Sequence, residues 1–158
     1  MLTAHLSSGY CLGKSSRLTG WTFAAATAGA VFPDFDMLFF YFVDQQSIHH
    51  HRYWVHIPVF WLAVAGIVLL VLWRSRYRAV ALAFFAGILM HLLLDSVSGG
   101  IMWLAPFNTR LWGLVTVPAS QPHWILSFVL HWTFAFEILI WGAAVYLYIK
   151  GRKRGTRR

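Results

Sequence analysis

Long apolar segments with almost no charge are the feature that most restricts the fold of this chain. Residues 57–73, 79–97 and 124–149 each approach or exceed the roughly 20 mostly apolar residues that a helix needs to cross a bilayer. Only 11% of the 158 residues are charged, against about 25% in an ordinary soluble domain. In hydrocarbon, backbone groups must pair within the protein, and helices pair them within one segment. The sequence therefore predicts an all-α integral membrane protein.

A fourth apolar region, residues 21–43, is interrupted by the sequence Pro-Asp-Phe-Asp at 33–36. Pro33 ends or kinks a helix, which predicts a half-length helix, a turn and a second apolar piece. Residues 1–13 form a short apolar segment that is expected to pack against the next helix. The prediction is a bundle of about four transmembrane helices plus a short N-terminal helix. Residues 1–149 would form one membrane-embedded domain, followed by a disordered basic tail at 150–158.

The basic residues are clustered, and their positions predict an orientation. Lys14 and Arg17 precede the first span, three arginines lie at 74–78, and six of the thirteen basic residues follow residue 149. Basic loops stay in the cytoplasm, so the C-terminus is expected to be cytoplasmic and the loops 44–56 and 98–123 to face outward. This distribution suits contact with anionic membrane lipids, and direct nucleic-acid binding is not expected.

Seven polar side chains are not explained by the apolar pattern, and they come from four separate segments. Under the orientation above, all of them map to the outer half of the membrane or its outer surface. Ionisable groups at this depth are costly and need partners, so they are expected to converge on one pocket. They are His5, Asp34, Asp36, His51, His56, His91 and Asp95.

A bound cation would satisfy these groups together, because imidazole and carboxylate ligands suit zinc, and also manganese or iron. Seven ligands exceed the usual four of one zinc ion, so one or two ions are expected. Separate structural roles are the alternative: a helix-ending turn at Asp34 and Asp36, and a mutually satisfied pair at His91 and Asp95. The histidine run 49–51 leaves the choice of ligand open, with His49 and His50 expected in an interfacial loop.

The order of these motifs resembles a known family. His5 with Gly9, Pro33 to Asp36, His51-Arg52 with His56, and His91 with Asp95 are similar to the pattern of the YdjM-like family. Members of that family are described as inner-membrane-associated, LexA-binding, metal-dependent hydrolases. The resemblance covers roughly residues 1–110 and implies a metal-dependent hydrolase in a bacterial or archaeal cytoplasmic membrane. The pattern is also similar to that of zinc-dependent phospholipase C enzymes, which points to phosphoesters.

These observations together predict hydrolysis of a lipid or lipid-linked phosphoester by metal-activated water. The residues expected at the reaction are Asp34, His51, His91 and Arg52, the last to hold an anionic group. The rival function is a metal-ion transporter or a non-catalytic, metal-stabilised scaffold for a protein partner. The nearly apolar inner halves of residues 59–73 and 79–89 argue against the transporter.

Overall fold

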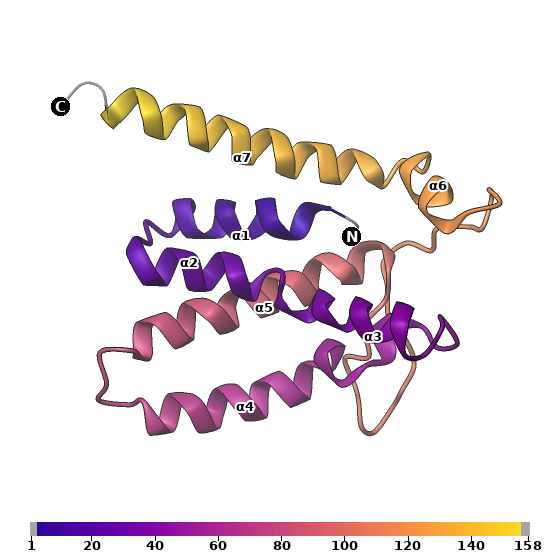
Figure 1. The fold of residues 1–158 in the computed structure, drawn as a ribbon, viewed down its shortest axis with the longest axis horizontal. Helices are drawn as coiled ribbons and strands as arrows, with labels where there is room; N and C mark the ends of the chain where they lie inside the picture. The colour runs from indigo at the N-terminus through magenta and orange to yellow at the C-terminus, as the bar shows by residue number, and fades with distance from the viewer. Residues whose placement is uncertain (1–2, 156–158) are drawn as a thin grey trace.

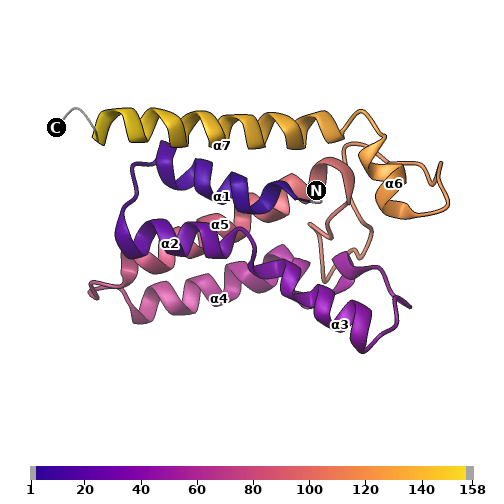
Figure 2. The ribbon, with the colours of Figure 1, turned by 45° about the horizontal axis from the view of Figure 1, so that its top comes forward.

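The computed structural model describes residues 3–155, which are helical apart from their connecting loops (Figure 1). Helices α1 (Ala4–Ser15) and α2 (Gly20–Gly29) form an antiparallel pair. The long helix α7 (Phe134–Gly155) runs beside α1 on the side away from α2, as both ribbon views show (Figures 1 and 2). The expected short N-terminal helix is therefore present and lies between α2 and α7. Its first two predicted residues lie outside the described part of the chain.

The predicted break at Pro33 is also present. After α2 the chain forms a single 3-10 turn, η1 (Phe32–Phe35), and then helix α3 (Asp36–Phe42). The two apolar pieces are bent by 55° relative to each other. The bend lies against α5 (Arg78–Ser98), where Asp34 of the Pro-Asp-Phe-Asp sequence comes within 3.7 Å of His91.

Helices α4 (Pro58–Val71) and α5 form a second antiparallel pair below α2 in Figure 1. Two short 3-10 turns, η2 (His50–Arg52) and η3 (Trp54–His56), precede α4 and carry the histidine-rich loop. Pro58 occupies the first turn of α4, where the missing N–H costs nothing. Trp61 of α4 packs in the core and donates a hydrogen bond from its Nε1 to the carbonyl of Val55 in η3 at 2.7 Å.

The predicted count of about four spans exceeds what the structure supports. Within residues 3–155, two helices are long and apolar enough to cross a membrane, α5 and residues 134–153 of α7, or three if the bent pair is one span. Helix α4, predicted over 57–73, has only 14 residues, which is about 21 Å of rise against a hydrocarbon core of about 30 Å.

The last span differs from its prediction at both ends. Residues 124–149 were expected to form one helix, but α6 (Trp124–Val129) stops and α7 begins at Phe134. His131 and Thr133 contact each other in the break through Nδ1 and Oγ1 at 2.9 Å. The tail was expected to be disordered from residue 150, yet α7 continues to Gly155, because Lys and Arg are good helix formers and suit a helix C-terminus. Residues 156–158 of the predicted tail lie outside the described range.

All three basic clusters lie at one end of the bundle. The α1–α2 turn, the α4–α5 turn and the C-terminal end of α7 are together at the left of Figure 1. The histidine-rich turns, α3 and α6 lie at the opposite end. The polarity on which the predicted orientation rests is therefore present in the fold.

Helices α2 and α5 approach each other very closely at two glycines. A Cβ atom on Gly29 would lie 2.1 Å from the carbonyl oxygen of Phe84, and one on Gly87 would lie 2.2 Å from that of Ala26. Small residues are the usual means by which membrane helices approach this closely. The contact matters for the site because His91 lies one helical turn beyond Gly87.

Candidate metal centre

Asp95 is the hub of a buried cluster near the C-terminal end of α5. Its Oδ2 lies 3.0 Å from His91 Nε2, 3.5 Å from His51 Nε2 and 3.6 Å from His56 Nε2. Its Oδ1 lies 3.2 Å from His5 Nε2. All five side chains are nearly inaccessible to solvent. One carboxylate therefore brings together imidazoles from α1, η2, η3 and its own helix.

The two aspartates of the bent pair complete the cluster from the other side. Asp36 Oδ2 lies 3.0 Å from His56 Nδ1. Asp34 Oδ1 lies 3.7 Å from His91 Nε2, and its Oδ2 lies 4.0 Å from His5 Nε2. The structure thus brings together all seven side chains that the sequence predicted would converge.

Backbone carbonyls orient two of the imidazoles. Nδ1 of His51 lies 2.8 Å from the carbonyl oxygen of Gly100, and Nδ1 of His91 lies 2.8 Å from that of Ala30. A carbonyl oxygen only accepts hydrogen bonds, so Nδ1 carries the proton in both rings. The lone pair is then on Nε2, which points at Asp95, and this is the arrangement usual for metal-ligating histidines.

His50 also reaches the cluster, although it was predicted to be only a loop residue. Its Nδ1 lies 3.8 Å from Asp36 Oδ2. His50 belongs to two of the three groups whose ligand atoms all lie within 4.8 Å of one another. His49 belongs to none of these groups, and its Nδ1 instead accepts a hydrogen bond from the backbone N–H of His51.

The electrostatics of the histidine loop favour a cation between the carboxylates. Burial lowers the pKa of His51 well below its usual value, because the charged ring loses its hydration. Burial also opposes charge on His56, but hydrogen bonds to Asp36 and Asp95 outweigh it and raise the pKa of His56 to about 9. A positive charge is therefore stabilised between these two carboxylates, and a metal ion would displace the proton that otherwise supplies it.

The residues fit a divalent metal ion. Oδ1 of Asp36 and Nδ1 of His50 are buried with no hydrogen-bond partner within residues 3–155, which is costly unless another group binds them. The three ligand groups combine imidazole nitrogens with carboxylate oxygens, the set that suits zinc, manganese or iron. They are His50, His51 and His56; Asp34, Asp36, His50 and His56; and His5, His91 and Asp95.

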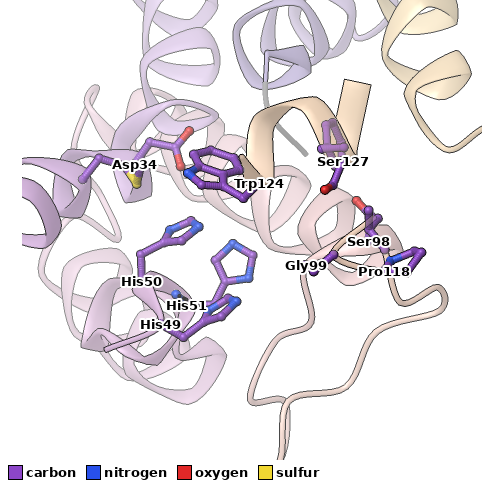
Figure 3. Close-up of a pocket in the computed structure, with 13 residues that line it drawn as sticks. Asp34, His49, His50, His51, Ser98, Gly99, Pro118, Trp124 and Ser127 are labelled. Carbon is purple, nitrogen blue, oxygen red and sulfur yellow. Dashed lines mark hydrogen bonds between the residues drawn. The ribbon is translucent and has the colours of Figure 1, made fainter. Parts of the chain in front are cut away.

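A cavity of about 390 Å³ opens onto one side of the cluster. Asp34, His50 and His51 contribute polar groups to its wall, and the side chain of Asp34 is 29% exposed. Figure 3 shows Asp34 close to Trp124 and the rings of His50 and His51 below it, with Ser98 and Ser127 on the other side of the space. The rest of the wall is mostly apolar and is contributed by Met37, Val117, Pro118, Ala119 and Phe128.

Two residues considered from the sequence lie elsewhere. Arg52, expected to hold an anionic group, is exposed and does not line the cavity. Glu137, the one acidic residue within the apolar segment 124–149, is fully buried, and its Oε2 accepts hydrogen bonds from Thr3 N at 2.7 Å and Thr3 Oγ1 at 2.6 Å. Glu137 thus fastens the start of α1, two residues before His5, to α7.

The cavity wall formed by residues 117–119 and α6 was not predicted. These residues carry no charged or metal-ligating side chain. The presence of ionisable groups in apolar segments, which indicated the candidate ligands, therefore could not indicate them. The signal for His50 was present in the run of three histidines, because adjacent positions of a tight turn can point into the same space.

Gly99 leaves the space that the His51 ring occupies, and its replacement should disturb the metal centre. A Cβ atom at Gly99 would lie 2.1 Å from Cε1 and 2.8 Å from Nδ1 of His51. We expect Gly99→Ala to displace the ring and weaken metal binding about tenfold or more, as loss of a ligand-orienting contact does. Gly66→Ala is the matched control, because nothing lies within 4 Å of a Cβ there. Isothermal titration with Zn²⁺ measures both, and equal affinities would show that His51 is not a ligand.

Fold and site together define a class: a helical protein with membrane-span candidates and a candidate metal centre buried at one end of its bundle. The sequence profile of the family described as YdjM inner membrane protein matches residues 1–155. The chain belongs to that family, and the resemblance seen in the sequence is confirmed. Comparison of this chain with the curated proteins and with the solved structures gave no match.

Proposed function

We propose that this protein is a metal-dependent membrane hydrolase acting on a lipid or lipid-linked phosphoester. The observation that carries the proposal is the cavity, which reaches Asp34, His50 and His51 of the cluster. A purely structural metal site is closed by protein ligands, whereas a catalytic one keeps an open position. Here the open side faces a space large enough for part of a substrate.

The cluster residues would share the work in the following way. When bound, a divalent ion would supply a nucleophile by lowering the pKa of a coordinated water. Asp95 and the imidazoles around it would hold the ion, with His51 and His91 fixed by their backbone carbonyls. Asp34, at the edge of the cavity, is placed to accept a proton from the attacking water.

The substrate class follows from the cavity wall and the setting. The polar groups Asp34, His50 and His51 share the lining of the space with the apolar side chains of Met37, Trp124 and Phe128. An amphipathic molecule with an ester near its polar end matches this mixed lining. Membrane lipids are the most accessible molecules of that kind for a protein of an inner-membrane family.

The proposed orientation places the C-terminus in the cytoplasm and the metal centre toward the outer face. Its support is the position of the three basic clusters at the end of the bundle opposite the histidine loop.

The test combines metal analysis with a phosphoesterase assay on detergent-purified protein. We expect one or two equivalents of zinc, manganese or iron, and metal-dependent release of phosphate or head group from fluorescent short-chain phospholipids. Chelation and His56→Ala should each abolish this activity. His131→Gln should retain it, because His131 belongs to none of the ligand groups and does not line the cavity.

The outcomes separate this proposal from its rival. Stoichiometric metal without hydrolysis of any phosphoester would favour the metal-stabilised scaffold. A protein that takes up no metal after reconstitution would contradict both.

A further inference from the structure

An apolar hairpin loop projects from the site end of the bundle. Residues 101–112, the hairpin loop, are closed by two backbone hydrogen bonds between Ile101 and Trp112, at 2.8 and 2.9 Å. At its tip Leu104 is 51% exposed and Phe107 is 96% exposed. Large apolar side chains that are this exposed usually mark a surface that contacts another molecule or a membrane, so we ask what covers the loop.

The hairpin loop lies beside the N-terminal end of α4. A groove of about 380 Å³ separates them, lined by Val59 and Leu62 on the helix and by Leu104 and Phe107 on the loop. Leu62 belongs to an exposed apolar face of α4 that continues to its far end, where Leu70 is 75% exposed. The apolar surface of the hairpin loop is therefore a continuation of the exposed face of α4.

Helix α4 is too short to match a bilayer by itself. Its 14 residues rise about 21 Å, roughly 9 Å less than the hydrocarbon core. The exposed arginines Arg74 and Arg76 follow its C-terminal end and fix the polar boundary there. The missing apolar thickness is therefore at the N-terminal end, where the hairpin loop lies.

Part of the backbone of the hairpin loop is paired within the loop. The N–H groups of Trp103, Ala105 and Asn108 donate to the carbonyls of Ile101, Met102 and Leu104 at 2.9–3.2 Å. The N–H of Arg110 donates to Oδ1 of Asn108 at 2.8 Å. This pairing lowers the cost of bringing the loop to the membrane boundary, where its apolar side chains can enter the lipid while its irregular backbone stays at the level of the head groups.

We infer that the hairpin loop inserts into the membrane boundary at the end of the bundle opposite the basic clusters. Leu104 and Phe107 lie among lipid acyl chains and extend the apolar thickness of α4. Arg110, whose guanidinium stacks over the Trp112 ring at 5.2 Å, remains at the level of the head groups. The base of the loop includes the turn at Gly100, whose carbonyl holds His51, so the metal centre lies close below the lipid head groups.

Site-directed spin labelling in liposomes of phosphatidylethanolamine and phosphatidylglycerol tests this inference. The native Cys11 is first replaced by Ser, and single cysteines are introduced as Phe107→Cys, Leu70→Cys and Ser120→Cys. Leu70 is the reference for lipid on α4, and Ser120 is an exposed polar position in the loop between the hairpin and α6. Phe107 is so exposed that its label should leave the fold intact, which elution of the labelled variants with their parent checks.

The measured quantity is the ratio of collision rates with oxygen, which concentrates in lipid, and with the water-soluble complex Ni-EDDA. We expect the ratio at Phe107 to approach that at Leu70 and to exceed that at Ser120 several-fold. A ratio at Phe107 equal to that at Ser120 and well below that at Leu70 would overturn the inference. Neither result depends on metal or activity, so the inference stands or fails separately from the hydrolase proposal.

Discussion

Replacement of Asp95 by Asn should abolish metal binding, with a loss of affinity of at least about 100-fold. Loss of a partner that only orients a ligand costs about 10- to 100-fold, and Asp95 is the group on which His5, His51, His56 and His91 converge. Asn keeps the size of the side chain but removes the charge and one acceptor oxygen. The measurement is elemental analysis of the purified protein, followed by titration with Zn²⁺.

Asp44→Asn is the matched control for this variant. Asp44 lies in the loop between α3 and η2 but accepts its hydrogen bond from the hydroxyl of Tyr53, away from the ligand groups. Asn retains an acceptor for that hydroxyl, so metal content should be unchanged. If Asp95→Asn retains stoichiometric metal while folded, the metal is held without Asp95, and the cluster that converges on Asp95 is not the metal centre.

The convergence of the seven polar side chains followed from the energetic cost of isolated ionisable groups. His91 and Asp95 are one helical turn apart on α5, and this spacing places both on one face of any helix. His5 and Asp34 had no such local relation. Only the requirement that charge at membrane depth finds a partner placed them in the same pocket.

The ends of the helices were less predictable from the sequence than their presence. The break at Pro33 and the helix over 78–98 follow from local rules, because proline restricts the backbone and an uninterrupted apolar run does not. The separation of α6 from α7 depends on polar contacts that hydropathy does not register. Hydropathy treats residues 124–149 as one segment because it ignores how His131 and Thr133 pair in the break.

The apolar half of the cavity was beyond the reach of sequence reasoning for a related reason. Val117, Trp124 and Phe128 are ordinary residues of a membrane protein, and nothing in their spacing distinguishes a cavity wall from a lipid-facing surface. Arg52 is the opposite case, because the sequence pointed to it and the structure leaves it outside the cavity lining. Its position between His51 and His56 in the chain suggested a place in the site, but the tight η2 turn directs it to solvent.

Gly87→Ala should destabilise the fold and weaken metal binding together, because the helix contact and the metal centre share one structural element. A Cβ atom there would lie 2.2 Å from the carbonyl oxygen of Ala26 and 2.7 Å from the backbone nitrogen of Ala30. Backbone atoms do not yield as a side chain does, so α2 and α5 must separate. Overpacking of this kind costs about 1–3 kcal/mol, seen as a lower thermal midpoint in detergent.

The separation would reach the metal centre through Ala30, whose carbonyl accepts the Nδ1 hydrogen bond of His91 at 2.8 Å. A displaced carbonyl no longer fixes the ring, and we expect about a tenfold or greater loss of Zn²⁺ affinity. Gly142→Ala in α7 is the control, because nothing lies within 4 Å of a Cβ there and alanine favours a helix by about 1 kcal/mol. A lower midpoint with unchanged affinity would show that the carbonyl of Ala30 does not orient His91. Unchanged values of both would show that α2 and α5 do not approach as closely as described, and that the ligands are assembled by the histidine loop alone.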